Sequence, residues 1–209
     1  MSRIARQGLC LVLAGPSGGG KTSVARALLE AETGLRLSVS VTTRPPRPTE
    51  REGVDYYFRA VADFQRLAAE GALLEWAQVL GRHFYGTPRE PVTAALAAGE
   101  DVLFDIDWQG FDSLRSTLPG DVVGVFLLPP SMAALRQRLE GRGGEDPAEI
   151  DRRMDRAREE ISHAPAFDHV IVNDSFDGTV VRVRDVLWAA RTATERLIGL
   201  RDWIAGLDS

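Results

Sequence analysis

Lysine is almost absent from this sequence of 209 residues: Lys21 is the only one, and the other 24 basic residues are arginines. Cysteine and histidine are also scarce, with one cysteine, Cys10, and three histidines. A single cysteine excludes an internal disulfide, and isolated histidines offer no zinc-binding cluster. The sequence also shows no repeats and no low-complexity tract. Its chemistry therefore has to lie in other residue types.

An excess of positive charge is missing as well. The net charge is −5, so the chain lacks the overall positive field that is typical of nucleic-acid-binding proteins. The apolar run before Gly15 is too short to cross a membrane. No segment resembles a signal peptide, and one cysteine within an apolar run favours a reducing compartment. We therefore expect a cytoplasmic protein without nucleic-acid or membrane partners, and the sequence leaves its oligomeric state open.

The one lysine lies in the stretch Gly15-Pro16-Ser17-Gly18-Gly19-Gly20-Lys21-Thr22, which fits the phosphate-loop pattern G-x-x-x-x-G-K-[ST]. Glycines let consecutive backbone N–H groups turn inward and form an anion-binding nest. In such loops the lysine reaches the β- and γ-phosphates, and the hydroxyl group is a ligand for Mg²⁺. The stretch therefore predicts a site for a nucleoside triphosphate.

The context of this loop supports the prediction. Residues 9–14 form an unbroken apolar run, which is typical of a strand buried on both faces. After the loop, apolar residues recur at helical spacing from Ser23 to Glu30. Lysine is a compact point charge, whereas arginine is a planar fork, so a single lysine at this position fits phosphate binding. The alternative is a glycine-rich turn that binds nothing.

A second part of the same site is predicted at Asp105, within the apolar run 101–107. A carboxylate at the end of a strand can hold the Mg²⁺ shell opposite Thr22. The alternative for Asp105 is a helix cap or turn residue. Asp107 lies two residues further on, so in a strand it would share a face with Asp105.

Hydrophobic patterns divide the chain into alternating strands and helices. Strands are predicted at 8–14, 35–43, 56–58, 73–77, 101–107, 122–128 and 169–172, and helices from the loop to about 32, at 61–70, 90–98, 131–140 and 147–162, and from the last strand to about 207. This alternation predicts an α/β fold with a doubly wound parallel sheet. We expect a core of 8–34, 91–140 and 164–209, an inserted subdomain of 35–90 with short strands and prolines, and a mobile lid of 141–163 hinged at glycines.

The inserted subdomain contains a stiff loop, Arg44-Pro45-Pro46-Arg47-Pro48. Proline fixes the backbone, so the two guanidinium groups are held in place near Ser40 and Tyr56. Fixed guanidinium groups, hydroxyl groups and a phenol suit a phosphate monoester. The alternative is a pair of solvated surface arginines, and the rigidity of the loop favours phosphate binding.

Motifs in order from about residue 9 to 174 resemble those of guanylate kinase. They are the segments 15–22, 38–47, 52–58, 74–77, 85–87, 105–110, 138–143 and 170–174. Many families share the phosphate loop, whereas the run Ser-x-Ser-x-Thr-Thr-Arg-x-Pro-Arg within 38–47 is much more specific. The resemblance implies a nucleoside monophosphate kinase of the P-loop fold that converts ATP and GMP to ADP and GDP in purine metabolism. It also implies dGMP as a further acceptor and Mg²⁺ as the cofactor.

The resemblance also implies a role for individual residues. ATP-binding residues would be Gly15, Pro16, Ser17, Gly18, Gly19, Gly20, Lys21, Thr22, Arg138 and Asn173, with Asn173 near the adenine. GMP-binding residues would be Ser40, Arg44, Arg47, Tyr56 and Tyr85 around the phosphate, and Glu75, Thr87 and Asp107 around the base. Catalytic residues would be Lys21, Arg44, Arg142 and Arg153. Mg²⁺ would be held by Thr22 and Asp105, partly through water.

The assignment of Glu75 to the base has a physical reason. Guanine presents N1–H and N2–H₂ as adjacent donors, which one carboxylate can accept together, whereas adenine has an acceptor at N1 and would leave the acid unpaired. The residues alone slightly favour an exposed strand carboxylate at Glu75 and a core position for Trp76. Arginines of 152–158 likewise fit a solvated helix face paired with acidic neighbours.

Two features depart from the family pattern, and two other functions stay open. Thr49 stands where the family usually has a glycine, and segment 81–85 is one residue longer, which bears on whether Tyr85 or Phe84 lies in the site. One rival is a related kinase that acts on a ribose phosphate and needs no residues that read a base. The other is a non-catalytic binding module of the same fold, in which the phosphate loop would be expected to have degenerated. The intact Gly20-Lys21-Thr22 favours an enzyme.

Overall fold

The centre of the molecule is a five-stranded parallel sheet. The computed structural model describes residues 4–79, 81–141 and 146–207. The strands of this sheet are β2 (Cys10–Ala14), β3 (Leu35–Leu37), β8 (Asp101–Asp105), β9 (Val122–Leu128) and β10 (His169–Val172), in the order β10-β9-β2-β8-β3. The sheet confirms the predicted α/β class. The chain adds strands to one side of β2 and then to the other, and such a reversal opens a crevice at the carboxyl ends of the strands.

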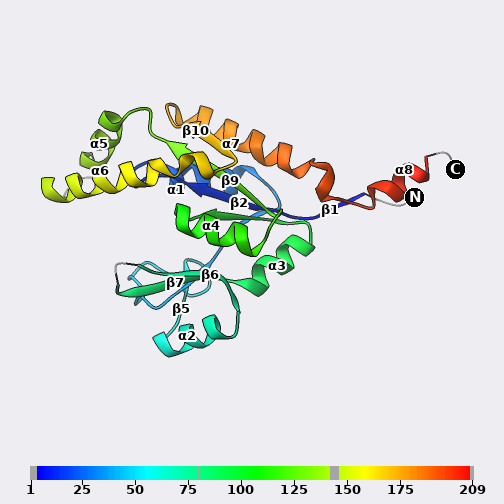
Figure 1. The fold of residues 1–209 in the computed structure, drawn as a ribbon, viewed down its shortest axis with the longest axis horizontal. Helices are drawn as coiled ribbons and strands as arrows, with labels where there is room; N and C mark the ends of the chain where they lie inside the picture. The colour runs from blue at the N-terminus through cyan, green and yellow to red at the C-terminus, as the bar shows by residue number, and fades with distance from the viewer. Residues whose placement is uncertain (1–3, 80, 142–145, 208–209) are drawn as a thin grey trace.

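Helices cover both faces of this sheet, as Figure 1 shows. They are α1 (Lys21–Ala31) and α7 (Phe176–Arg191) on one face, and α3 (Arg89–Ala97) and α4 (Trp108–Thr117) on the other. Every residue of β2 is buried, because its side chains alternate between the two layers. Leu11 and Leu13 pack with Leu28 of α1, whereas Cys10 and Val12 face the opposite layer.

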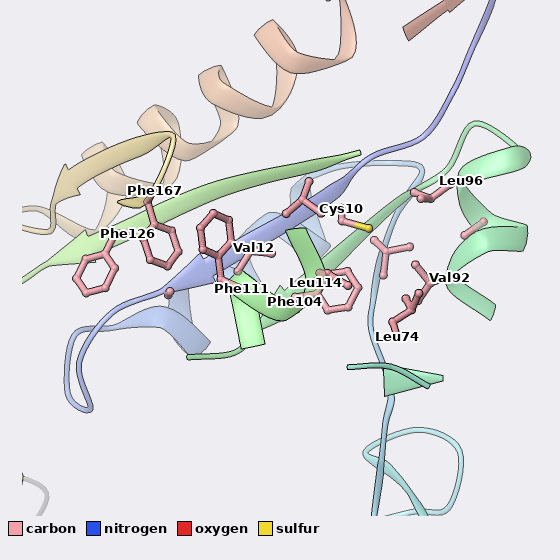
Figure 2. Packing of buried hydrophobic residues seen from close by; sticks show 14 of the residues in the cluster. Cys10, Val12, Leu74, Val92, Leu96, Phe104, Phe111, Leu114, Phe126 and Phe167 are labelled. Carbon is pink, nitrogen blue, oxygen red and sulfur yellow. The ribbon is translucent and has the colours of Figure 1, made fainter. Parts of the chain in front are cut away.

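Aromatic rings fill much of the layer under α4 (Figure 2). The ring of Phe111 stacks on Phe167 with centroids 4.0 Å apart, and Phe126 meets Phe167 edge-on at 5.1 Å. Gly124 of β9 makes room for this stack, because a Cβ atom there would lie 2.4 Å from the ring of Phe111. The glycine therefore lets α4 approach the strand that it covers.

A second sheet lies beside the first and carries the middle of the chain (Figure 1). Its strands are β4 (Ser40–Thr42), β5 (Tyr56–Phe58), β6 (Leu73–Val79) and β7 (His83–Pro88), in the order β5-β4-β7-β6. Helix α2 (Val61–Ala69) packs against it through Phe64, which is buried with Val41 and Leu73. The boundaries predicted for the insertion stay a prediction, but the short strands expected within it are present.

Two further helices pack together at the far end of the molecule from the chain termini (Figure 1). They are α5 (Met132–Glu140) and α6 (Pro147–Ser162), and Leu135 and Leu139 of α5 are buried with Ile150 and Met154 of α6. The turn η1 (Ala164–Ala166) then leads into β10. None of the helices in the described ranges combines the length and apolar character needed to span a bilayer.

The structure corrects several boundaries expected from the sequence. The predicted strand 35–43 is two strands in different sheets, β3 and β4, because the chain passes from the central sheet to the second one at Ser38 and Val39. Strand β7 and helix α4 are additional elements. The predicted C-terminal helix ends at Arg191 and is followed by the turn η2 (Thr194–Arg196), strand β11 (Leu197–Ile198) and helix α8 (Leu200–Ala205). Strand β11 pairs with β1 (Ala5–Arg6), so tertiary pairing overrides the apolar helical pattern of this segment.

A buried network of charges fixes this C-terminal arrangement. Arg191 donates to Asp101 at 2.7 Å and to Glu32 at 2.6 Å. The side chains of Asp101 and Glu32 are 0% and 3% exposed, and that of Arg191 is 8% exposed. Arg6 also pairs with Asp101, and Arg184 pairs with Glu32. Helix α7, strand β8, the end of helix α1 and the N-terminal strand therefore meet at one set of ion pairs.

Replacement of Arg191 with methionine should destabilise the fold strongly. Removing one partner of a buried pair leaves carboxylates without full compensation, which costs about 3 kcal/mol in the free energy of unfolding. Urea denaturation followed by circular dichroism measures this change. The exposed Arg201→Met variant is the control and should shift stability by less than about 0.5 kcal/mol. Equal stability of the two variants would contradict the role given to the network.

Candidate active site

Three segments that carry predicted ATP- and Mg²⁺-binding residues lie at the carboxyl ends of the central strands. The glycine loop follows β2, Asp105 is the last residue of β8, and Asn173 follows β10 directly. Parallel strands end at the same edge of a sheet, so these three segments meet there. A cavity of about 130 Å³ lies within the glycine loop, and one of about 370 Å³ opens beside it toward the second sheet. Thr22 lines both cavities.

The glycines of the loop adopt conformations that other residues rarely reach. The φ angles are 143° at Gly15, 84° at Gly18 and 96° at Gly20. A Cβ atom at Gly15 would also lie 2.4 Å from the carbonyl oxygen of Leu127. Helix α1 begins immediately after Gly20, so its first N–H groups add to the positive end of the loop. This backbone is a preformed concave site for an anion.

Lys21 and Thr22 provide the side chains of this loop. Lys21 Nζ donates to the carbonyl oxygen of Gly15 at 2.6 Å, which folds the ammonium group over the loop. Thr22 Oγ1 donates to Asp105 Oδ2 at 2.7 Å. The expected proximity of Thr22 and Asp105 is therefore present, and the cap suggested as an alternative falls instead on Asp107, which accepts from the N–H of Gly110 at the start of α4.

This pair of oxygen groups fits a hard divalent cation. A hydroxyl and a carboxylate at the mouth of a phosphate site are ligands that Mg²⁺ accepts, together with phosphate oxygens and water. Within residues 4–79, 81–141 and 146–207, histidine, cysteine and acidic side chains form no group of three that could hold a metal ion.

A hydroxyl and a phenol from the second sheet line the larger cavity, and an arginine lies next to the phenol. Ser40 and Tyr56 line this cavity together with Thr22 and Asp105 of the core. The guanidinium carbon of Arg44 lies 5.4 Å from the ring centroid of Tyr56. Burial raises the pKa of the Tyr56 phenol, and the neighbouring Tyr85 acts in the same direction. Arg47 lies on the exposed part of the same loop.

Tyr85 and Phe84 of β7 have different neighbours, and Tyr85 is the one that contacts Tyr56. The ring centroids of Tyr85 and Tyr56 are 6.1 Å apart, whereas Phe84 stacks on Phe64 at 5.4 Å in the hydrophobic cluster. Adjacent residues of a strand point to opposite faces, so only one of the two can contact the cavity. Gly81, in the turn between the two strands, has a φ angle of 64°.

Glu75 and Thr87 lie opposite each other on β6 and β7. Thr87 Oγ1 donates to Glu75 Oε1 at 2.6 Å, and Thr87 is fully buried. Burial raises the pKa of the Glu75 carboxyl group, although the hydrogen bond from Thr87 opposes this shift and the charge of Asp107 adds to it. Glu75 is therefore a half-buried acid, and the alternative of an exposed strand carboxylate does not hold. Trp76 is the more exposed residue at 51%, which corrects its expected core position.

Comparisons with known proteins show the family of this chain. The sequence profile of the family described as guanylate kinase matches residues 7–190. The chain belongs to the guanylate kinase family. It is 58% identical over 202 residues to a guanylate kinase of Granulibacter bethesdensis, covering 97% of this chain and 94% of that protein. It is 55% identical over 205 residues to one of Gluconobacter oxydans, covering 98% of each. A crystal structure of guanylate kinase from Anaplasma phagocytophilum superposes with a TM-score of 0.78 at 38% identity and covers 97% of this chain and 96% of that one.

The resemblance to guanylate kinase assigns several arginines to the lid. Those that the structure describes have different partners. Arg153 lies on α6, where its Nε is 3.6 Å from Glu149 Oε1. Neighbouring Arg152 and Arg158 pair with acids of the same helix, as expected for a solvated face. Arg138 donates to the backbone carbonyl of Asn173 at 2.9 Å. Arg142 lies outside the described residues, so its predicted role stays a prediction, as does that of Arg153.

Sequence reasoning missed two acids at this guanylate kinase site. Glu50 binds the Arg44 guanidinium through both carboxylate oxygens, at 2.7 and 2.9 Å, and accepts from the N–H of Arg47 at 2.8 Å. This carboxylate raises the pKa of Arg44. Glu160 of α6 is half-buried and faces the charges of Lys21 and Asp107, and burial raises its pKa. In the sequence, only the position of Glu50 three residues after Arg47 could have indicated that its carboxylate bonds to this loop.

Proposed function

We propose that this protein is an ATP-dependent guanylate kinase that transfers the γ-phosphoryl group of ATP to a phosphate oxygen of GMP. One observation carries the proposal most directly. The cavity beside Thr22 and Asp105 of the phosphate loop site is also lined by Ser40 and Tyr56 of the phosphate-binding cluster in the second sheet. Two phosphate-bearing substrates can therefore approach each other across one cavity, as in-line phosphoryl transfer requires.

The chain's own residues would act mainly by positioning and by charge. The loop of residues 15–22 would hold the ATP phosphates, with Lys21 moving from the Gly15 carbonyl to the β- and γ-phosphates. Ser40, Arg44, Arg47, Tyr56 and Tyr85 would hold the GMP phosphate. Two anions repel each other, so positive charge from Lys21, Arg44, Arg153 and Arg142 would lower the barrier to their approach. Closure over the cavity would exclude water, which otherwise could accept the phosphoryl group.

Selection of the guanine base would fall to Glu75 and Thr87. Thr87 fixes one oxygen of Glu75, so the carboxylate has a set orientation. An ionised Glu75 can accept from the adjacent N1–H and N2–H₂ of guanine, with Asp107 nearby. A kinase of ribose phosphates has no need of this half-buried pair, which disfavours that rival. We infer that dGMP is a second acceptor, because none of the proposed contacts involves the ribose 2′ position.

Magnesium would be held by Thr22 and Asp105, partly through water, together with the ATP phosphates. When bound, it would neutralise charge on the phosphate oxygens. We also infer a cytoplasmic location, since the single cysteine, Cys10, cannot form an internal disulfide and this favours a reducing compartment. Burial raises the pKa of this thiol to about 12, so Cys10 is an unreactive core residue. No partner beyond ATP and GMP is proposed.

Replacement of Lys21 with alanine should lower kcat by at least about 100-fold, because it removes a charge from the developing transition state. Lys21→Arg should not restore activity, because a planar fork does not replace a point charge in this loop. A coupled assay for ADP measures both, and circular dichroism checks the fold. The exposed Arg66→Ala variant serves as the control. Undiminished turnover of folded Lys21→Ala would refute the assignment.

Glu75 should give GMP recognition a distinctive pH dependence. Its pKa is raised, so the carboxyl group takes up a proton at a higher pH than an ordinary glutamate, and the neutral acid accepts guanine poorly. The kcat/KM for GMP should therefore fall on the acid side as pH decreases through this raised pKa. Glu75→Gln should lower kcat/KM for GMP by about 10- to 100-fold and leave the KM for ATP nearly unchanged.

The comparison with Glu75→Gln also cancels the effect that protonation of the GMP phosphate has on the measured kcat/KM. The substrate phosphate protonates identically in both assays, so the ratio of wild-type to variant kcat/KM isolates Glu75. This ratio should decline toward acid pH. A ratio that is constant with pH, or an unchanged KM for GMP in the variant, would contradict the proposal that Glu75 recognises the guanine base.

A further inference from the structure

Asn173 occupies a junction between three parts of the phosphate site. It follows β10, is 6% exposed, and its backbone N–H donates to the carbonyl oxygen of Leu128 at 2.7 Å. Its own carbonyl oxygen accepts from Arg138 of helix α5 at 2.9 Å. The backbone of Asn173 is therefore fixed from two sides, and its side chain has a defined starting point.

Both ends of the Asn173 amide have partners within the protein. Nδ2 donates to the carbonyl oxygen of Gly19 at 2.8 Å, and Oδ1 accepts from Thr179 Oγ1 at 3.0 Å. Thr179 lies in the first turns of α7 and is fully buried. An acceptor on one side and a donor on the other set the orientation of the amide, so the NH₂ group has to face the loop.

The bond to Gly19 determines how the next peptide group faces the cavity. A trans peptide is planar, so its N–H points away from its C=O. If Asn173 holds the Gly19 carbonyl, the N–H of Gly20 must point in the opposite direction. Among the turns, loops and caps of the described residues, that N–H donates to no backbone carbonyl oxygen. Gly20 also lines the 130 Å³ cavity together with Lys21 and Thr22.

The contact between Asn173 and the loop is also close enough to constrain residue 20. A Cβ atom at Gly20 would lie 2.4 Å from Asn173 Nδ2. Gly20 has φ 96° and ψ 6°, a left-handed conformation, and it is the residue that precedes helix α1. Asn173 thus packs against the peptide whose rotation would turn an N–H group away from a bound phosphate.

We propose that Asn173 is a positioning residue that orients the Gly19–Gly20 peptide for phosphate binding, rather than a residue that recognises adenine. This inference rests on the proposed kinase function of the loop. Asn173 acts through the backbone, because its side chain lies behind the loop and both of its polar ends are used there. Thr179 is the second member of this arrangement, since it fixes the amide from the other side.

The decisive comparison uses a ligand that has phosphates but no base. Asn173→Leu keeps the size of the side chain, carries no charge, and has neither donor nor acceptor. Calorimetry with magnesium tripolyphosphate and with magnesium ATP then measures the affinity of each for the wild type and the variant. Both ligands should bind about tenfold more weakly to the variant, because an unpaired buried carbonyl no longer fixes the loop. The KM for GMP should be nearly unchanged.

Other outcomes would overturn the proposal. Weaker ATP binding with unchanged tripolyphosphate binding would assign Asn173 to adenine. A lower melting temperature with unchanged affinity for both ligands would leave it a purely structural role. Val172→Thr, an exposed neighbour on β10, is the matched control and should change neither affinity.

A second pair of variants keeps the test open if Asn173→Leu fails to fold. Thr179→Val removes the hydroxyl that fixes the amide and should weaken both ligands together, whereas Thr179→Ser should restore them. Equal affinities of the two Thr179 variants would count against the proposal. Tripolyphosphate binding needs no turnover, so this result is separate from a failure of the wild type to phosphorylate GMP.

Discussion

A phosphate loop works only if its backbone N–H groups stay turned toward the anion when no anion is present. Isolated peptides do not keep such an arrangement, because the groups repel one another and ordinary residues disfavour positive φ. Here Gly15, Gly18 and Gly20 supply the conformations, and β2 and α1 anchor the two ends of the loop. Lys21 donates to the carbonyl oxygen of Gly15, and Asn173 donates to that of Gly19. The loop is therefore held by the fold rather than by its ligand.

The remainder of the site solves a second electrostatic problem, which is to bring two phosphate groups together. The structure divides the positive charge between two bodies: the loop at the edge of the central sheet, and the arginine loop of the second sheet. One of these arginines, Arg44, is paired with an acid, since Glu50 accepts from its guanidinium through both carboxylate oxygens. Such a pair keeps the guanidinium oriented, so less conformational freedom would be lost on binding of a phosphate at the proposed site.

Local signals in the sequence predicted the parts of the site that depend on backbone chemistry. The glycine spacing, the run of β2 and the acid of β8 placed Thr22 beside Asp105 correctly, because parallel strands end together. The specific motif around Arg44 predicted the family. Local sequence patterns did not predict the tertiary contacts. Nothing near residue 38 marks the passage between two sheets, and the apolar spacing after Arg191 favours a helix that pairing of β11 with β1 replaces.

The same limit explains why the surroundings of single residues were not predicted. Trp76 was expected in the core because tryptophan usually is buried, but it lies on the outer side of the aromatic cluster, 51% exposed. The expected place of Asn173 near adenine stays a prediction, and only the folded chain shows that its amide donates to the carbonyl oxygen of Gly19. Glu50 belongs to no motif, and its hydrogen bonds with the Arg44 guanidinium are evident only in the folded chain.

The most direct test of this account is ADP release from ATP and Mg²⁺ with a panel of acceptors: GMP, AMP, UMP, dTMP and ribose bisphosphate. The account predicts strong stimulation by GMP and little by the others, because only guanine offers two donors to Glu75. Stimulation by the sugar phosphate alone would keep the ATP site and contradict the role of Glu75 and Thr87. No stimulation by any acceptor, from folded protein, would contradict the central claim that this cavity transfers a phosphoryl group to GMP.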